Sequence, residues 1–449
     1  MMSSRASHVR RVPGGLILAV ALIQLAHLVY FDPFTGTYGD TVGYVSWADT
    51  ILTWPAFGIF YQPLYPAFLK TAMLLTDPEH FRRFVVLAQI AMVVATSILV
   101  YSIAIRLTDS RWLASAAALL LSLEITLTVY EYLILTEILA IFLSVLFIYA
   151  SYQTLIACGR GWAVLAGLSL LALALTKFGY VPFAFVAGVV SVMMAWRLRK
   201  VANSESLRRY ALALSITGIL LAAKVAVTFH YTGALSVHGA WGLVQFLNVK
   251  PEMVLRLPDG DPDLAEFKSY YARHGQLFEV WEELGGSPSS AKFTRAAVKI
   301  YSQALLRHPI QALGVALSVY YRQNSQNVLF CYPEERNHRV LESSQNVLFM
   351  VEKGINRAIF GTGLGAMWTA LCLVLGVLLL LTSISSEQKI LLSLLLAFIL
   401  FSVFVSTWLF NGTWISDNTR MRLMYEAPMV ALWFSVPYRL IRLRGVRTS

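Results

Sequence analysis

The chain contains ten apolar runs long enough to cross a lipid bilayer, and this feature limits its fold more than any other. A bilayer core roughly 30 Å thick requires about 20 residues of helix. The runs cover about 14–31, 83–105, 112–129, 137–156, 161–176, 180–196, 210–229, 362–382, 388–410 and 425–440. We therefore predict an all-α polytopic membrane protein with about ten transmembrane helices, within a range of ten to twelve.

The amino-acid composition supports a membrane location. Of the 449 residues, 57% are apolar and only 14% are charged, whereas a soluble domain carries nearer a quarter charged residues. The mean hydropathy is +0.63. The three cysteines, Cys158, Cys331 and Cys372, indicate neither a disulfide framework nor a zinc site.

The formal net charge of +11 would suggest a nucleic-acid partner in a soluble chain, but here the basic residues mark topology. They gather on one side of the predicted membrane, at Arg5, Arg10, Arg11, Arg106, Arg111, Arg160, Arg197, Arg199, Lys200, Arg208, Arg209, Arg439, Arg442, Arg444 and Arg447. The positive-inside rule makes that side cytoplasmic. We therefore predict cytoplasmic termini, a location in the cell (inner or plasma) membrane and no nucleic-acid partner.

Three units follow from this topology. Residues 1–229 form an N-terminal membrane module that includes a first outer loop at 32–82, residues 230–361 form a small, mostly helical outer-face segment, and residues 362–449 form a C-terminal membrane module. No small-residue cleavage site follows the first run, which is typical of a retained signal anchor. The stretch 309–330 is apolar only as far as Tyr321, so we predict an interfacial or protein-covered helix. A tilted span paired with another weak span at 341–360 would keep the same topology.

The first outer loop has the pattern of two short amphipathic helices separated by a turn rich in proline and aromatic residues. The first helix begins near Tyr38-Gly39-Asp40-Thr41-Val42-Gly43-Tyr44, and the second near Tyr61-Gln62-Pro63-Leu64-Tyr65-Pro66. Tyrosine and tryptophan suit the depth of lipid headgroups. A carboxylate at a helix start is most often a cap, so Asp40 alone has a structural explanation.

Further motifs follow at the predicted outer ends of the spans. In chain order they are Tyr130-Glu131-Tyr132 through Thr136-Glu137, the run 171–176 closed by Lys177, Arg307-His308-Pro309, and Arg420-Met421-Arg422 before Pro428. Together with the first loop, their order resembles the GT-C superfamily of membrane glycosyltransferases. The resemblance is nearest to the bacterial branch related to protein O-mannosyltransferases and lipid A aminoarabinose transferases. Those enzymes transfer a sugar from a polyprenyl-phosphate carrier to an acceptor on the outer or lumenal face.

The resemblance implies roles for individual residues. Asp40 matches the first-loop acid, which acts as catalytic base or binds a divalent metal such as magnesium or manganese, and Glu137 matches a second acid. The cations available to the donor phosphate are Lys70, Lys177, Arg420 and Arg422, of which we prefer Lys177 and Arg420. The loop residues expected near the substrate are Tyr44, Tyr61 and Tyr65. The chain departs from the aminoarabinose transferases, which have an acid and a lysine where Tyr61 and Gln62 precede Pro63.

Metal dependence stays open on the sequence. The outer segment contains His230, His238, His274 and His308, but no two of them have the spacing of metal ligands along a helix. The acidic stretch 259–263 is not a calcium loop, because Leu264 stands where that loop needs glycine and Tyr270 where it needs an acid.

Three functions compete. The first is an inverting glycosyltransferase with its active site on the outer face, a polyprenyl-phosphate sugar as donor and a glycan, lipid or protein as acceptor, acting as a monomer or weak homo-oligomer among membrane lipids. The second is a transporter or flippase of lipid-linked sugars. The third is an outer-face polysaccharide polymerase or ligase. Against transport, the mid-span ionisable residues Glu124 and Lys224 have no repeated counterpart in the sequence.

Overall fold

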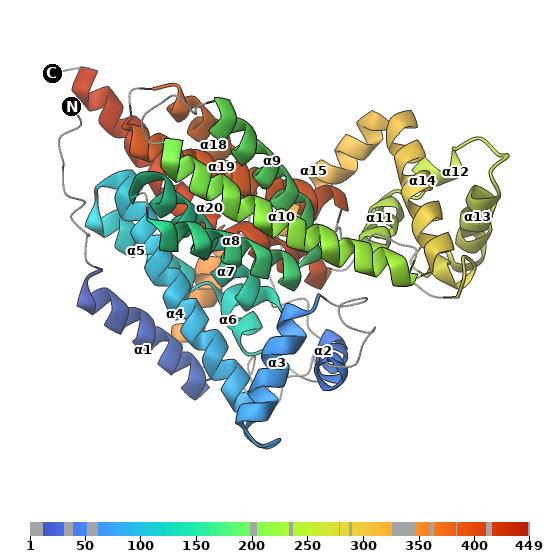
Figure 1. Ribbon diagram of the computed structural model, residues 1–449, viewed down its shortest axis with the longest axis horizontal. Coiled ribbons are helices and arrows are strands. Elements are labelled where there is room, and N and C mark those ends of the chain that lie inside the picture. Colours follow the sequence, from blue (N-terminus) through green and yellow to red (C-terminus); the bar gives the residue numbers. More distant parts are fainter. Residues whose placement is uncertain are drawn as a thin grey trace.

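The computed structural model is a bundle of helices with a smaller helical group at one end (Figure 1). It describes residues 12–30, 39–51, 62–157, 159–197, 204–232, 237–277, 279–286, 290–325, 347–359, 363–382, 384–409 and 415–447. These residues form helices and no strands. The all-α fold predicted from the apolar runs is therefore confirmed.

The N-terminal helices make up most of the bundle. They are α1 (Gly14–Tyr30), α2 (Gly39–Thr50), α3 (Leu64–Leu75), α4 (Phe81–Thr108), α5 (Arg111–Ser122), α6 (Ile125–Glu131), α7 (Glu137–Ala157), α8 (Arg160–Thr176), η1 (Phe178–Tyr180), α9 (Val181–Arg197) and α10 (Ser204–Thr232). Helix α7 is central, because 72% of the residues in its most apolar 18-residue stretch are buried. Helix α10 is peripheral, because only 28% are buried in the corresponding stretch.

The remaining helices divide between the smaller group and the bundle. The smaller group contains α11 (Val237–Val249), α12 (Glu252–Leu255), α13 (Pro262–His274), η2 (Val280–Glu282) and α14 (Ala291–Arg307), and α15 (Pro309–Ser325) leads back from it. The bundle is completed by α17 (Val347–Ile359), α18 (Leu364–Leu380), α19 (Ser386–Phe404), its continuation η4 (Val405–Leu409) and α20 (Ile415–Arg447).

Each of the ten predicted runs falls on a helix or on a bent pair of helices. Among the described residues, five helices are long and apolar enough to cross a membrane: Phe81–Thr108, Glu137–Ala157, Phe178–Arg197, Glu205–His230 and Ser386–Leu409. Two further candidates are bent pairs, α5 with α6 at 52° and α17 with α18 at 58°. The chain is thus an integral membrane protein with five to seven such helices by length and composition, and the count of ten stays a prediction.

Side-chain caps explain where several helices begin. The Ser110 hydroxyl accepts a hydrogen bond from the Leu113 amide, and Asp261 accepts from the Asp263 amide at the start of α13. The Glu124 carboxylate accepts from the Leu127 amide at 2.7 Å, and so begins α6 directly after α5 has ended. Such caps satisfy amides that have no partner inside the helix. An acid within an apolar run therefore produces the break between α5 and α6.

The helices of the smaller group enclose a core of their own. Phe246, Phe267 and Phe293 are fully buried within it, and Trp408 from η4 stacks on Phe246 with ring centroids 5.7 Å apart. We call α11–α14 the cap. It corresponds to most of the predicted outer-face segment.

Helix α15 covers part of the bundle with one face only. It packs against α18 and α20, burying Ala312, Val315 and Val319, while Ile310 and Leu317 on its other face are exposed. This one-sided burial agrees with a protein-covered helix at 309–330. Whether α15 also enters the membrane stays a prediction.

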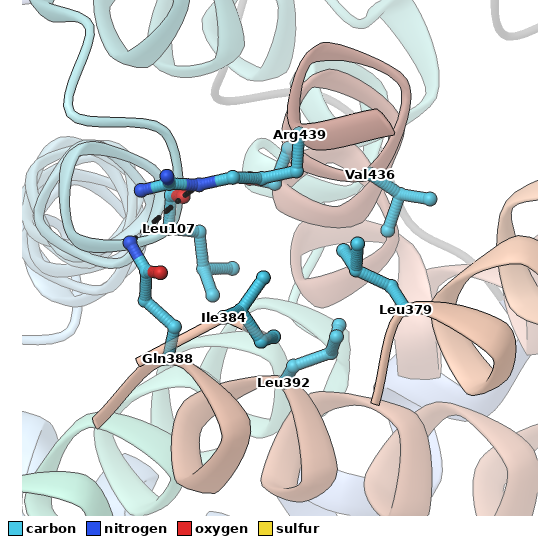
Figure 2. Close-up of a pocket in the computed structure, with 8 residues that line it drawn as sticks. Leu107, Leu379, Ile384, Gln388, Leu392, Val436 and Arg439 are labelled. Carbon is cyan, nitrogen blue, oxygen red and sulfur yellow. Dashed lines mark hydrogen bonds between the residues drawn. The ribbon is translucent and has the colours of Figure 1, made fainter. Parts of the chain in front are cut away.

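Polar side chains from α19 and α20 meet the end of α4, and we call this group, Gln388, Arg439 and Asp109, the clasp. Figure 2 shows Gln388 and Arg439 beside Leu107. The Arg439 guanidinium donates to the Leu107 carbonyl and pairs with Asp109, and the Gln388 amide donates to the same carbonyl at 3.4 Å. Asp109 ends α4 in the left-handed conformation, with φ 59°. The free carbonyls at the end of α4 are thereby satisfied by α19 and α20.

Candidate functional site

The first turn of α2 lies against the loop that leads into α7. The Thr41 hydroxyl donates to the Ile134 carbonyl at 3.4 Å, three residues before Glu137. The backbone of Asp40 belongs to the same turn of α2, and its side chain lies outside the described residues. The first outer loop therefore meets the start of α7.

Tyr65 at the start of α3 anchors this contact from the other side. It is fully buried, its hydroxyl donates to Gln89 on α4 at 2.9 Å, and its ring meets Tyr44 edge-on at 5.3 Å. Gln89 in turn donates to the carbonyls of Glu131 and Leu133. Burial raises the pKa of Tyr65 well above its ordinary value, and the neighbouring Glu137 carboxylate and Tyr44 raise it further. Tyr65 is thus a neutral donor within electrostatic reach of Glu137.

Glu137 and Lys177 form a nearly buried ion pair. The Lys177 ammonium lies 2.8 Å from the Glu137 carboxylate, with the lysine side chain 12% exposed and the glutamate 1%. Glu137 opens α7 and Lys177 follows the last residue of α8, so both charges come from helix ends. The structure joins an acid and a cation that the sequence suggested separately.

The start of α20 reaches the same region through its backbone. The Tyr180 hydroxyl, three residues after Lys177, donates to the Met424 carbonyl at 2.9 Å. Arg420 lies one helical turn before Met424 on α20, and its side chain is outside the described residues. The contact with η1 is thus at Met424, one helical turn after Arg420.

Two of the other predicted cations are engaged elsewhere, and one predicted residue cannot be placed. Arg422 is fully buried between Glu124, at 3.0 Å, and Glu426, at 3.1 Å. Lys70 lies 3.7 Å from Asp49 in the last turn of α2. Tyr61 lies outside the described residues. Binding of the donor phosphate by Arg422 or Lys70 stays a prediction.

The structure also shows polar residues that the sequence reasoning missed. Glu124, taken from the sequence as a lone mid-span acid, bonds to Asn356 at 2.6 Å and to Arg422. His27 on α1 bonds to Glu352 on α17. The only sign of this network in the sequence is the presence of His27, Glu124 and Glu426 within apolar runs.

The described residues do not assemble a metal site. They contain no group of three or more histidine, cysteine, aspartate or glutamate side chains placed to hold a metal ion. Glu137, the acid nearest to the first-loop helices, already has the Lys177 ammonium on its carboxylate. The side chain of Asp40, the predicted metal ligand, lies outside the described residues, so metal binding by Asp40 stays a prediction.

Comparisons with known proteins find similarity only among solved structures. No family model and no curated protein matches the chain. Among solved structures, it is similar to the archaeal oligosaccharyltransferase AglB from Archaeoglobus fulgidus in complex with an inhibitory peptide and a dolichol-phosphate, with 14% identity and a TM-score of 0.47 over 96% of this chain and 51% of that one. It is also similar to ArnT from Cupriavidus metallidurans bound to undecaprenyl phosphate, with 16% identity and a TM-score of 0.30 over 95% of this chain and 77% of that one.

The match to the archaeal enzyme is partial in length. The chain spans about half the length of the oligosaccharyltransferase. The same holds for the apo form of that enzyme, in which 97% of this chain matches 51% of that one, at 13% identity and a TM-score of 0.47. A further structure of that enzyme is a complex with zinc and sulfate.

Proposed function

We propose that the chain is an integral membrane glycosyltransferase that moves a sugar from a polyprenyl-phosphate carrier to an acceptor hydroxyl or amine on the outer face of the membrane. The observation that carries the proposal is the meeting of three segments. The first turn of α2 contacts the loop before Glu137, and Glu137 pairs with Lys177 at 2.8 Å. Two residues chosen from the family resemblance, Glu137 and Lys177, are thus in contact, and the backbone of a third, Asp40, belongs to the turn of α2 beside them.

The reaction is an inverting displacement at the anomeric carbon. The acceptor oxygen forms a bond to that carbon while the bond from the carbon to the phosphate oxygen breaks, and the acceptor proton passes to the Asp40 carboxylate. The polyprenyl phosphate leaves as an anion. A carboxylate suits this step because it takes the proton and also stabilises an oxocarbenium-like carbon.

The leaving phosphate needs positive charge beside it. Lys177 supplies an ammonium group at the end of α8, and Glu137 holds that group in place through their ion pair. Arg420 supplies the second cation, because the bond from Tyr180 to Met424 keeps the start of α20 beside η1. In this proposal Glu137 positions Lys177, and Tyr65 and Tyr44 pack the wall of the site.

The test is transfer from a panel of radiolabelled synthetic polyprenyl-phosphate sugars by the purified protein in nanodiscs. We expect Asp40→Asn to lower donor consumption about 10²- to 10⁴-fold, the usual contribution of a general base. Asp49→Asn is the matched control, because Asp49 lies in the last turn of the same helix and is exposed. Chelator and divalent metal form a separate arm.

Equal consumption by Asp40→Asn and wild type would remove Asp40 as the base. Glu137 would then be the next candidate, tested by Glu137→Gln in the same assay. Loss of activity in Asp49→Asn as large as that in Asp40→Asn would show that the two variants act through the fold of α2.

A second function, transport of a lipid-linked sugar, is favoured by one observation. The α5–α6 pair is broken at Glu124, and that acid belongs to a buried charged network. Broken helices with ionisable groups at mid-membrane are typical of transporters. Transport predicts that a fluorescent lipid-linked sugar changes leaflet in proteoliposomes without chemical change, and that Asp40→Asn leaves this movement intact.

A further inference from the structure

Four glutamates meet inside the bundle, apart from the proposed transferase site. Their exposed fractions are 4% for Glu124, 0% for Glu131, 0% for Glu352 and 1% for Glu426. Glu124 lies within electrostatic range of both Glu352 and Glu426, and Glu131 lies within range of Glu352. The acids come from the start and end of α6, from α17 and from α20, so the cluster joins three elements that are far apart in the chain.

Positive charge does not balance these acids. Arg422 is shared by Glu124 and Glu426, and Glu352 has only the His27 imidazole. Among the described residues Glu131 contacts no cation, and its polar neighbour is the amide of Gln24. The other titratable groups facing the cluster are Tyr132 and Tyr425, which are neutral as phenols. Among the described residues, four carboxyl groups face one guanidinium and one imidazole. At least two negative charges are then left over, which a low-dielectric interior does not tolerate.

The hydrogen bonds of His27 link two of these acids. With the Gln24 amide oriented so that its nitrogen faces Glu131, that nitrogen lies 2.9 Å from both carboxylate oxygens and 3.2 Å from His27 Nδ1. In this orientation Nδ1 accepts from the Gln24 amide, and Nε2–H donates to Glu352. Glu131 and Glu352 are thereby joined through Gln24 and His27.

Unpaired acceptors at the centre of the cluster indicate protons on its carboxyl groups. In the part of the chain that the structure describes, Glu352 Oε2, Glu426 Oε1 and Asn356 Oδ1 are buried without a hydrogen-bond partner. Asn356, Glu124 and Glu426 line one small cavity, so the unpaired oxygens of Asn356 and Glu426 belong to the same place. A proton on a carboxyl group supplies a donor of the kind that such oxygens lack.

The cavity borders an apolar groove that opens at the side of the bundle. The groove has a volume of about 520 Å³, and it shares Leu120, Ile359 and Trp433 with the cavity. Its other walls come from α5, α18 and α20. The groove residues next to the cluster are therefore apolar, and none of the residues that line the groove is basic.

We propose that the cluster is an intramembrane proton-binding site, in which Glu131, Glu352 and Glu426 share protons beside Glu124, and that these protons keep α17 docked. Helix α17 is attached by Glu352 to His27 and by Asn356 to Glu124. Loss of the protons places like charges on α17 and α6 and releases α17. The proposal goes beyond the transferase and does not depend on it.

Infrared spectroscopy of the protein in nanodiscs tests the protons directly. Near pH 8 the exposed carboxyl groups are ionised, so we expect the carbonyl stretch of protonated carboxyls to come from the cluster. Its intensity falls in Glu131→Gln, Glu352→Gln and Glu426→Gln and stays unchanged in Glu266→Gln, an exposed acid paired with Lys292. Absence of the band in wild type, or a band that none of the three variants changes, overturns the proposal.

Thermal stability and amide hydrogen exchange test the proposal even where a variant folds poorly. Because glutamine mimics a protonated glutamate, we expect Glu131→Gln and Glu352→Gln, whose carboxyl groups contact no guanidinium among the described residues, to keep the unfolding temperature of wild type. Glu137→Gln, which breaks an ion pair, lowers it. We also expect amide exchange in α17, corrected for intrinsic rate, to rise at alkaline pH in wild type and to rise less in Glu352→Gln. Identical corrected exchange at neutral and alkaline pH in wild type overturns the docking role.

Discussion

At the scale of single residues, the pair formed by Lys177 and Glu137 sets the electrostatics of the proposed site. Both side chains are largely removed from water, so each charge depends on the other for compensation. An ammonium group already held by a carboxylate is oriented before a phosphate arrives. Lys177 therefore loses less side-chain conformational entropy when the phosphate binds.

We expect Lys177→Met to have two separable effects. It leaves the Glu137 carboxylate buried without its cation, which costs about 3–5 kcal/mol of stability, and it weakens donor binding. The double variant Glu137→Gln with Lys177→Met recovers most of the lost stability but not the donor affinity. Unfolding temperatures and donor KM values of the two singles and the double give a mutant cycle, and strictly additive stabilities would contradict the pairing.

Residue roles could be predicted from sequence only where a motif places the residue at a helix end. Tyr44, Tyr65, Glu137 and Lys177 were chosen in this way, and the structure brings them together. Their catalytic roles stay predictions. Arg422 has the same kind of motif, yet it pairs with Glu124, and a contact between residues so far apart in the chain depends on tertiary packing that hydropathy does not contain.

At the scale of elements, the positions of the helices followed from the apolar runs, whereas their breaks did not. Hydropathy averaged over a run predicts one helix at 112–129, but Glu124 caps α6 and turns it 52° from α5. A single polar residue changes the average little and changes the backbone greatly, because its carboxylate competes for the amides of the next turn.

The clasp at the end of α4 gives a prediction for one element. We expect Arg439→Leu to lower the free energy of unfolding by about 1.5–3 kcal/mol, the usual worth of hydrogen bonds to a charged group, because it leaves the Leu107 carbonyl and Asp109 without their guanidinium. The matched control is Arg442→Leu, an exposed arginine 5.3 Å from the Tyr438 ring. Unfolding followed by intrinsic fluorescence in detergent measures both, and equal effects would contradict the clasp.

At the scale of the whole molecule, the cap lies toward one end of the bundle and the clasp toward the other (Figure 1). The basic residues that predict the cytoplasmic side include Arg106, Arg111 and Arg439, at the end that carries the clasp. The cap is therefore expected outside the cytoplasm.

Cysteine labelling in intact cells measures this orientation. In a background with Cys158→Ser, Cys331→Ser and Cys372→Ala, we expect an impermeant maleimide to label Lys292→Cys on the cap, whose native side chain is 48% exposed. Glu205→Cys, at a position where the native side chain is 62% exposed, is labelled only after lysis. The reverse pattern would place the cap in the cytoplasm and remove the proposed outer-face site.

Helix α20 carries both Arg422 and Arg439, and each of them forms an ion pair with another part of the bundle. The two arginines are roughly 25 Å apart along the helix. Tilting that helix against α4 or α6 would separate one guanidinium from its carboxylate. Helix α1 rests on α4 and α5, and α17 reaches the bundle through polar contacts to His27 and Glu124. We therefore expect a lateral opening for a lipid chain to need less free energy if α1 and α17 move than if α20 moves. In this picture α20 is the helix that stays in place.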